Sequence, residues 1–567
     1  MSFNPSMYRI LPLLLFLTAC AGDPLELHVA EVDGTEASDA LTAIDLGAEK
    51  ITISTELLPE HGDLNLKFSF RAAEGTAATL LLQNKYAVTL PDLSVTNATP
   101  RFQTDLTPGV WQDLEVVFIA AQDDAPAILP AIYLNGSLVH YQQAYAANDA
   151  PAGPLTLNIE SGELEIKDLR YSDQGGVGST VNADGVSLNI PLLRYEYYDL
   201  AKDVVDVNNW AQLTPAKTGY INRFDLNAIK EKGSAYAIRF FGKLTVPKAG
   251  EYKLSVYTPA SVAAYVDGQK IINDPGKHGA RQTDGFIELS EGRHDFRLDY
   301  VQSGGWSKID VKYQAPGESK VKFLNTMESN KAIAGPGAPN PQKLKTDDYP
   351  YLLRSFLYFP APKVYESAEK RTHVISVGEA DGPHYSLDLQ SGALLQMWRG
   401  DFADTYDMWV GRGEPQVMRP LGPAIALDGA PQWGTIDGDD DRWPDTIAAD
   451  AGFRHVRHTL DEAGRPTFEY TMKGGHSLSD KLTPENGSLL RELTHTAGGN
   501  TGVYTLVAAA REIAEVAPGE YALRGPGMGL KIESYDGSRL VLQRSGGKDR
   551  LLAEIPAKGH LTYRLNW

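Results

Sequence analysis

The chain is short of cysteine, of long apolar runs and of clustered basic residues, and each shortage argues against a class of protein. Cys20 is the only cysteine among 567 residues, so there is no disulfide framework and no Cys-x-x-Cys-His site for covalent haem. Apart from the N-terminal stretch, no apolar run is long enough to cross a bilayer, which argues against a transmembrane transporter. The 53 Lys and Arg residues face 73 Asp and Glu, a net charge of −20, and form no basic block. Nucleic acid is therefore not an expected partner, because phosphate neutralisation needs clustered basic side chains.

Motifs of common catalytic sites are absent as well. The sequence has no Gly-x-Ser-x-Gly elbow, no phosphate-binding loop and no His-Glu-x-x-His pair. His455 and His458 would share a face only on a helix, which their surroundings do not favour. Carboxylates are plentiful, but no spacing shows which of them face each other across a cleft. We therefore assign no catalytic residue from the sequence.

The N-terminal stretch has the layout of a secretory signal, with a charged start, a short apolar middle and small residues at the exit. Arg9 precedes an apolar run from Ile10 to Leu17, and residues 17–20 read Leu-Thr-Ala-Cys. This tetrapeptide resembles the bacterial lipobox, which implies cleavage before Cys20 and lipidation of that residue. The alternative is an ordinary cleaved signal followed by a chance cysteine.

Lipidation would tether the mature protein to a membrane by acyl chains, each buried methylene contributing about 0.8 kcal/mol. We expect a signal peptide over residues 1–19 and a lipidated tether over 20–24. In lipoproteins of diderm bacteria an Asp after the cysteine favours the inner membrane, and Ala21 stands there instead. The resemblance therefore implies an outer-membrane location, in either the periplasmic or the surface-facing leaflet.

Most of the chain consists of short segments of alternating apolar and polar residues, punctuated by 53 Gly and 34 Pro. This pattern predicts an all-β protein, and a mature chain of about 550 residues is too long for one core. Two stretches rich in Gly, Ser or Pro, 172–190 and 316–349, are predicted linkers. We therefore expect three β-sandwich domains in series, over residues 25–171, 191–315 and 350–567.

The first domain combines alternating strands with tight turns, as a β-sandwich does. Asn135-Gly136 lies between apolar pairs and predicts a hairpin turn. Residues 109–116, 133–140, 153–157 and 166–170 resemble the concanavalin-like sandwich of the 3-keto-disaccharide hydrolase family (domain of unknown function 1080). Members of that family often carry Tyr-Glu-Val-Gln in the concave face, where this chain has Ala87 in place of the glutamate. The resemblance therefore implies the fold, with the family's carboxylate missing.

The second domain begins near Tyr197-Tyr198 and reads Gly-x-Leu-x-Val-Pro-x-Ala-Gly-x-Tyr over residues 242–252. From end to end it is similar to the PA14 domain, with a hairpin turn predicted at Asp267-Gly268. Lectin-like PA14 domains hold calcium for sugar binding on an Asp-Asp-Gly just before the strand that ends in Tyr-x-Asp-Gly, which is residues 265–268 here. Residues 257–262 stand at that place without a carboxylate, so calcium-dependent capture is not implied here. Asp267 and Asp274 remain, as a turn and a loop aspartate.

The third domain again shows short β segments, and a large β-sandwich is the expected fold. Residues 372–402 and 464–470 resemble a β-rich region of large secreted bacterial proteins. There it often accompanies c-type cytochrome or sugar-dehydrogenase-like domains. No activity follows from this resemblance.

Four of the eight tryptophans gather in one window of the third domain, together with several arginines. The residues concerned are Trp398, Arg399, Trp409, Arg412, Trp433 and Trp443. Flat aromatic faces beside polar side chains suit the apolar faces and hydroxyls of sugar rings. These six residues form the candidate carbohydrate-binding site. The alternative is that the tryptophans fill the core of a large sandwich.

One acidic turn is the candidate metal site. Asp437, Asp439 and Asp441 alternate as in a calcium loop and would supply hard oxygen ligands from one side. Arg442 stands where such loops have Gly, and no downstream Glu completes the set. The alternative is a solvated acidic turn. Calcium is thus the one cofactor that the sequence suggests.

Together these features predict a lipid-anchored, extracytoplasmic protein that binds carbohydrate. Binding would be weak at each site and strengthened by several domains on one tether. One alternative is a glycoside or 3-keto-sugar hydrolase, with convergent acids in a deep cleft. Another is a scaffold or accessory subunit of a membrane-associated dehydrogenase or surface complex, with a protein partner docked on an apolar patch.

Overall fold

The computed structural model describes most of the chain beyond residue 24. The described ranges are 25–32, 42–43, 50–51, 53–95, 98–101, 106–122, 125–172, 180–182, 185–201, 204, 206–208, 213–325, 342–359, 369–380, 382–410, 416–448, 450–498, 503–545 and 547–567. They form 44 strands and two four-residue helices, α1 (Leu226–Ile229) and α2 (Tyr406–Trp409), which confirms the predicted all-β class. No helix in these ranges is long and apolar enough to cross a membrane. Cys20, Arg412 and parts of both predicted linkers lie outside the described residues.

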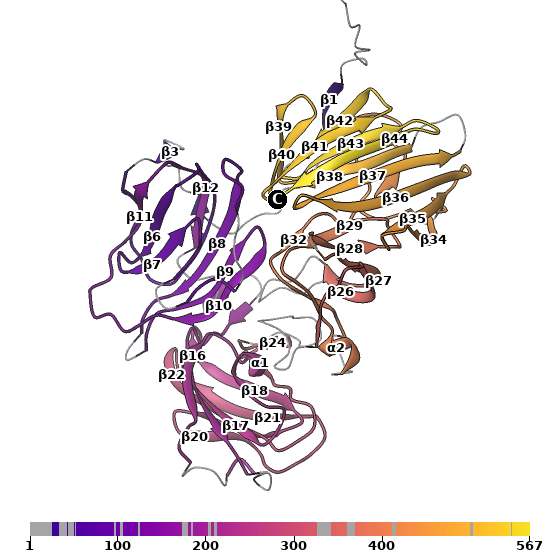
Figure 1. The fold of residues 1–567 in the computed structure, drawn as a ribbon. Helices are drawn as coiled ribbons and strands as arrows, with labels where there is room; N and C mark the ends of the chain where they lie inside the picture. Colours follow the sequence, from indigo (N-terminus) through magenta and orange to yellow (C-terminus); the bar gives the residue numbers. More distant parts are fainter. Residues whose placement is uncertain are drawn as a thin grey trace, which may run out of the picture.

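The N-terminal sandwich packs a seven-stranded sheet against a four-stranded one (Figure 1). The larger sheet holds, in spatial order, β10 (Ser137–Ala144), β9 (Ile128–Leu134), β8 (Gln112–Ile119), β5 (Leu64–Ala72), β12 (Leu164–Ser172) and β2 (Thr42–Ala43), with β3 (Lys50–Ile51) also on β12. The smaller sheet holds β4 (Thr55–Glu60), β11 (Pro154–Ser161), β6 (Ala77–Leu82) and β7 (Tyr86–Leu90). Alternate residues of β5, such as Leu64 and Leu66, are buried in the core between the sheets. The hairpin turn predicted at Asn135-Gly136 is confirmed, since both residues have positive φ between β9 and β10.

The middle sandwich follows a short ribbon of β13 (Thr180–Asn182) and β14 (Gly185–Ser187). Its six-stranded sheet holds β16 (Lys217–Ile221), β15 (Leu193–Asp199), β17 (Tyr236–Val246), β22 (Gly292–Gln302), β19 (Ser261–Val266) and β20 (Gln269–Asp274). Its four-stranded sheet holds β21 (Arg281–Leu289), β18 (Gly250–Thr258), β23 (Asp310–Gln314) and β24 (Val321–Phe323). The turn predicted at Asp267-Gly268 joins β19 to β20, again with two positive φ values.

The C-terminal domain wraps one large core between an eight-stranded sheet and two five-stranded sheets. The eight strands are β34 (Arg454–Leu460), β35 (Pro466–Met472), β36 (His476–Glu485), β37 (Ser488–Ala497), β44 (His560–Asn566), β41 (Met528–Tyr535), β40 (Glu520–Arg524) and β39 (Glu512–Ala517). One five-stranded sheet holds β26 (Tyr351–Phe359), β27 (Glu369–Gly378), β28 (His384–Asp388), β29 (Leu394–Trp398) and β32 (Ala424–Ala426). The other holds β1 (Glu26–Glu31), β42 (Arg539–Arg544), β43 (Asp549–Ile555), β38 (Val503–Ala510) and β33 (Trp433–Gly434). A small sheet of β25 (Lys343–Leu344), β30 (Asp401–Asp404) and β31 (Arg419–Leu421) lies beside them.

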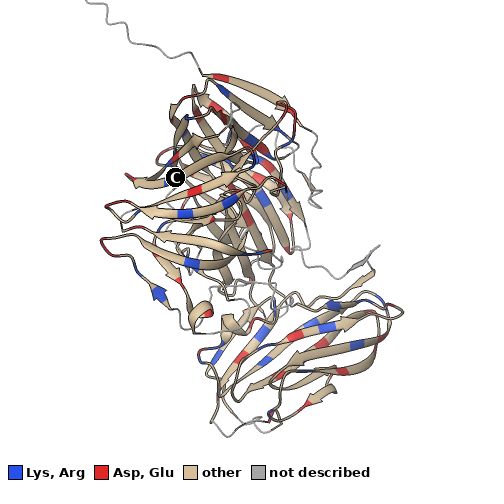
Figure 2. Ribbon diagram, turned by 90° about the vertical axis from the view of Figure 1, so that its right-hand side faces the viewer, with Lys and Arg blue, Asp and Glu red and all other residues tan. Residues whose placement is uncertain are grey.

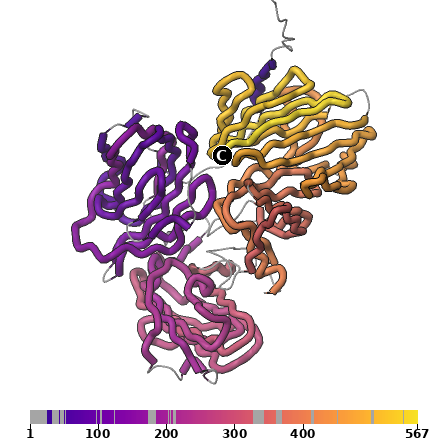
Figure 3. Tube along the Cα trace, in the orientation of Figure 1, coloured from indigo at the N-terminus to yellow at the C-terminus, as the bar shows by residue number. Residues whose placement is uncertain are grey.

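The first described strand belongs to the C-terminal domain, not to the first sandwich. β1 pairs in parallel with β42, from Glu26 opposite Arg539 to Glu31 opposite Arg544. Figures 1 and 3 show this indigo strand beside the yellow end of the chain. The sequence-based division began the first sandwich at residue 25, and the structure corrects that boundary. A short alternating strand does not encode which sheet edge it completes, so its partner could not be read locally.

Charges are interspersed over the strands. Figure 2 shows blue basic and red acidic positions alternating along them, without a block of one sign. Local groupings of charge therefore depend on which strands lie side by side.

Candidate functional site on the middle sandwich

A row of basic and aromatic side chains crosses the outer face of the six-stranded sheet. On β17, Phe240 and Leu244 are buried in the core, so Phe241 faces outward. The strand registers place four residues opposite one another in the order Arg194, Phe241, Arg297 and Tyr265, on β15, β17, β22 and β19. Side chains directly opposite on one face of a sheet lie within contact distance.

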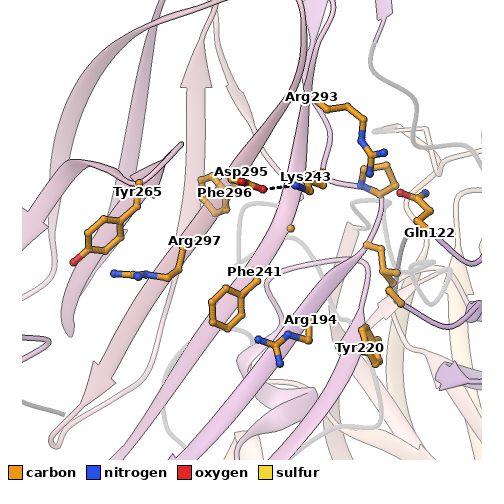
Figure 4. A pocket seen from close by; sticks show the side chains of 15 residues that line it. Gln122, Arg194, Tyr220, Phe241, Lys243, Tyr265, Arg293, Asp295, Phe296 and Arg297 are labelled. Carbon is orange, nitrogen blue, oxygen red and sulfur yellow. Dashed lines mark hydrogen bonds and ion pairs between the residues drawn. The ribbon is translucent and has the colours of Figure 1, made fainter. Parts of the chain in front are cut away.

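Each arginine of this row lies over an aromatic ring. The Cζ of Arg194 is 4.5 Å from the centroid of the Phe241 ring, and the Cζ of Arg297 is 3.8 Å from that of Tyr265. Figure 4 shows both arrangements. Cation–π contacts contribute about 0.5–1 kcal/mol at exposed sites, enough to favour one orientation of each guanidinium group.

Two carboxylates lie beside the arginines, in the adjacent row of the same sheet face. Glu196 is 3.0 Å from Nη2 of Arg194, and Asp299 accepts a 2.8 Å hydrogen bond from Nε of Arg239 and lies 3.3 Å from Nη2 of Arg297. The side chains of Glu196 and Asp299 are 14% and 4% exposed, whereas those of Arg194 and Arg297 are 43% and 37% exposed. On this face the two arginines are therefore the more exposed groups and the two acids the more buried ones.

The row forms one side of a pocket of about 420 Å³. Lys243, Arg293 and Asp295 continue the charged side, and Lys243 pairs with Asp295 (Figure 4). Tyr220, on β16, lies beside Arg194 in the same sheet, and Gln122 of the N-terminal sandwich also lines the pocket. The volume lies within the range of small-molecule sites, and both polar groups and apolar surface line it.

An ion pair stands beside one end of this pocket, where Gly268 lines it. Asp267 accepts a 2.7 Å hydrogen bond from Nδ1 of His294 and a 2.8 Å bond from the Asp295 N–H. The bond from His294 lowers the pKa of Asp267. Burial alone would lower the pKa of His294, but its bonds to Asp267 and to the Ser290 carbonyl outweigh burial and raise that pKa.

Most of the strands that form this face come from a segment that matches a known protein family. Residues 217–325 match the PA14 domain. This segment is a PA14 domain. The match confirms the resemblance predicted from the sequence. β15, which carries Arg194, ends at Asp199, before the matched range begins at residue 217.

No curated protein matches the chain. Among solved structures, the PA14 sugar-binding domain from an RTX adhesin is 17% identical, with 24% of this chain and 94% of that chain covered and a TM-score of 0.21. The PA14 domain of the antifreeze protein MpAFP is 16% identical, with 26% and 92% covered and a TM-score of 0.21. The A domain of epithelial adhesin 9 from Candida glabrata, in complex with Galβ1-3GlcNAc, is 12% identical, with 26% and 90% covered and a TM-score of 0.20. Scores this low carry no argument about the ligand of this chain.

The segment at residues 257–262, from the end of β18 to the start of β19, uses its Thr258 and Ser261 hydroxyl groups in hydrogen bonds within the protein. The Thr258 hydroxyl donates to the Lys308 carbonyl at 2.8 Å, and the Ser261 hydroxyl accepts the N–H of Val207 at 3.0 Å. Asp274 is ion-paired with Arg281. Burial would raise the pKa of Asp274, but its bonds from Arg281 and Thr283 lower it. Across the described ranges, no group of three or more His, Cys, Asp and Glu side chains could hold a metal ion.

The acidic turn proposed for calcium is bonded within the protein. Asp439 pairs with Arg539. One carboxylate oxygen of Asp441 accepts the backbone N–H groups of Asp437 at 2.8 Å and of Gly438 at 3.0 Å. These contacts occupy carboxylate oxygens of Asp439 and Asp441 that the calcium hypothesis required as ligands. They are contacts that an acidic turn without calcium would also make.

Three tryptophans of the candidate carbohydrate-binding site in the C-terminal domain are buried, which contradicts their proposed role. Trp398 and Trp443 are 0% exposed and Trp433 is 3% exposed, so none of the three can stack on a sugar ring. Trp433 lies in the core between the large sheets, as the alternative stated, and Trp398 and Trp443 are buried in two smaller hydrophobic clusters of the same domain. Arg399 donates to the Gly487 carbonyl at 3.0 Å and lies over the Trp567 ring. Trp409, on α2, is 46% exposed, and Arg412 lies outside the described residues.

A larger cleft of about 760 Å³ lies between the N-terminal sandwich and the C-terminal domain. Three of its carboxylates pair with basic groups, namely Asp113 with Arg511, Asp168 with Arg524 and Asp428 with Lys548. Burial would raise the pKa of Asp168, but the hydrogen bond and charge of Arg524 outweigh it and lower that pKa. A general acid for glycoside cleavage needs a raised pKa. Asp168 therefore does not meet that requirement of the hydrolase hypothesis.

Proposed function

We propose that this protein is a lipid-anchored, extracytoplasmic carbohydrate-binding protein and that the pocket on its PA14 domain holds the sugar. The row of Arg194, Phe241, Arg297 and Tyr265 carries the proposal. Its guanidinium groups donate hydrogen bonds to sugar hydroxyls. Phe241 and Tyr265 are each half-buried, and the ring surface that the guanidinium groups leave open meets the C–H face of a sugar. The PA14 match over residues 217–325 supports the same proposal, because lectin-like members of this family bind sugars.

The first described strand, β1, and the PA14 domain lie at opposite ends of the molecule. β1 begins at Glu26, shortly after Cys20, and in Figure 1 it stands at the top while the PA14 domain lies at the bottom. A tether at Cys20 would hold the C-terminal domain near the outer membrane and present the PA14 domain away from it. Cys20→Ser should then move the protein from the outer-membrane fraction to the soluble fraction. Unchanged membrane retention would contradict the anchor.

A glycan-binding screen of the mature protein without Cys20 tests the binding function. Phe241→Ala and Tyr265→Ala should each weaken retention at least fivefold. Phe286→Ala is the matched control, because Phe286 is 59% exposed on β21, in the other sheet of the same domain. The proposal would be wrong if the wild-type protein bound none of the glycans, or if Phe241→Ala bound them as tightly as the wild type.

The same screen separates the alternative functions. Sugar released into the supernatant would favour the hydrolase, and a co-purifying subunit without glycan retention would favour the scaffold. Repeating the screen with chelator tests calcium directly. We expect retention to be unchanged, because the proposed contacts are made by arginine and aromatic side chains.

A further inference from the structure

We infer that the N-terminal sandwich completes the sugar pocket of the PA14 domain and that Gln122 determines which sugar the pocket prefers. The inference rests on the proposed function and adds a specificity-determining residue from a second domain. Gln122 and Ala125, which line the pocket, belong to the N-terminal sandwich, whereas Arg194 and Phe241 belong to the middle one. The pocket is thus shared between two domains.

The two domains meet at β16, an edge strand of the six-stranded sheet. The register of β16 on β15 places Tyr220 opposite Arg194, so the row of basic and aromatic side chains extends to this edge. Tyr220 and Ala125 both pack against one hydrophobic cluster to which the two domains contribute. The buried residues of this cluster are Ile119, Ile128 and Leu192. The N-terminal sandwich therefore borders the pocket at the Tyr220 end of the row.

Hydrogen bonds fix how the two domains dock. The side-chain amide of Gln142, on β10, donates to Oδ1 of Asn222 at 2.7 Å and accepts the Asn222 N–H at 3.1 Å. The Tyr141 hydroxyl donates to Asp225, the N-cap of α1. Tyr141, Asn222 and Asp225 are buried, so separating the domains would cost these hydrogen bonds. The interface thereby holds Gln122 at one place relative to the row.

The backbone of Gln122 is bonded, whereas its side chain is open to a ligand. The Gln122 N–H donates to the Ala125 carbonyl at 3.1 Å, and the Gln122 carbonyl accepts the Ala125 N–H at 2.8 Å. Among the residues that the structure describes, none is hydrogen-bonded to the Gln122 side-chain amide. Figure 4 shows this side chain on the same side of the pocket as Arg293 and Tyr220. An amide group offers an acceptor and two donor hydrogens, all of which a sugar hydroxyl can use.

An amide group distinguishes between sugars more sharply than an aromatic ring does. The ring of Phe241 meets the C–H face of a sugar, which many sugars share. A hydrogen bond from Gln122 forms only where a hydroxyl comes within about 3 Å of the amide in a favourable direction. Two sugars that differ only in the direction of one hydroxyl therefore differ in this bond. Gln122 should thus determine the preference between sugars, while Phe241 contributes to the affinity for all of them.

Three methyl glycosides test this division. They are methyl β-D-glucopyranoside and its epimers at carbon 4 and carbon 2, the galactoside and the mannoside, each used to compete with glycan retention by the mature protein. We expect the wild type to prefer one of them. Gln122→Ala should weaken binding of that sugar about fivefold, through loss of a hydrogen bond, and change the others less than about twofold. Phe241→Ala should weaken all of them alike.

Two further variants assign the effect to the placement of the amide group. Gln122→Asn keeps the amide but sets it back by one methylene group, so it should lose the preference as Gln122→Ala does. Gln282→Ala is the matched control, because Gln282 is an exposed glutamine on β21, in the other sheet of the PA14 domain. It should leave the preference unchanged. Thermal unfolding of each variant checks that the fold is intact.

The outcomes separate this inference from the proposed function. Glycan retention that depends on Phe241, with a preference that Gln122→Ala leaves unchanged, would overturn the inference alone. Equal weakening of all three glycosides by Gln122→Ala would overturn it too, because a purely structural role predicts that result. A wild type that prefers none of the glycosides, or binds none, also contradicts the inference. The proposed function itself is contradicted only if the glycan screen shows no binding either.

Discussion

Arg524, at the end of β40 in the C-terminal domain, donates a hydrogen bond to Asp168 on β12 of the N-terminal sandwich. The same guanidinium donates to the Ser69 hydroxyl at 2.7 Å and to Glu512 at 3.1 Å, and its side chain is 8% exposed. Asp168 reaches it because the register of β12 shifts between Lys167 and Arg170, and Asp168 has a φ of 52°. One arginine thus joins two domains.

Removal of this arginine should loosen the junction. Arg524→Ala leaves Asp113 and Asp168 without a shared partner at the interface. We expect a loss of about 2 kcal/mol in the free energy of unfolding, below the range for a fully buried pair because Asp168 is half-exposed. Arg511→Ala is the control, since Arg511 is 51% exposed and also pairs with Asp113, and it should cost under about 0.5 kcal/mol. Urea unfolding measures both, and similar losses would contradict the role given to Arg524.

A glycine at the same junction should resist substitution. A Cβ on Gly527 would lie 2.5 Å from Nδ2 of Asn135 and from Oε1 of Gln112. Neither side chain can yield cheaply, because they bond each other at 2.6 Å and Asn135 also accepts the Asp113 N–H at 2.8 Å. Gly527→Ala should therefore lower the Tm more than Gly547→Ala. Both glycines have positive φ, but nothing lies within 4 Å of a Cβ on Gly547. Calorimetry compares them, and equal shifts would mean that backbone strain alone acts.

The Asp267–His294 pair should make stability depend on pH. The raised pKa of His294 gives a contribution that is complete below about 6.5, its ordinary value, and is lost as pH rises through the raised value. The lowered pKa of Asp267 gives one that is present above its ordinary value of 3.8 and is lost on acidification. The pair therefore stabilises most between about pH 4 and 6.5. Asp267→Asn should lower the Tm at pH 6, with a smaller difference from wild type at pH 8.5.

The substitution suits this test because Asn tolerates the positive φ that residue 267 adopts in its turn. Asp267→Asn in a His294→Gln background is the matched comparison. There the Tm difference should be small and independent of pH. A constant difference in the wild-type background would show that the ion pair contributes nothing.

Two tryptophans of the same window should behave differently. Trp398 is 0% exposed, donates to the Phe402 carbonyl at 2.8 Å and stacks on the Phe402 ring. Trp398→Ala should cost about 3–5 kcal/mol by leaving a cavity. Trp409→Ala, at the exposed end of α2, should stay within about 0.5 kcal/mol of wild type. Denaturant unfolding measures both, and glycan retention by Trp409→Ala shows whether this residue also binds sugar.

Local sequence patterns determined the all-β class, the Asn135-Gly136 and Asp267-Gly268 turns and the PA14 domain. Alternation fixes which face of a strand is buried, and a two-residue turn depends on backbone conformations that few residues adopt. Even the outward side chains of β17 could be read from the alternation in Arg239 to Lys243. These properties need no knowledge of distant residues.

Tertiary structure alone decided which outward side chains meet. The register between four strands places Arg194, Phe241, Arg297 and Tyr265 in one row, and the sequence analysis missed all four. Tertiary packing buried Trp398, Trp433 and Trp443, whose clustering in the sequence suggested a surface site, and placed β1 beside β42. Each of these relations joins residues that are separated along the chain. The pairing energy that selects one such partner over another is spread over whole sheets and cores, so no single stretch of sequence contains it.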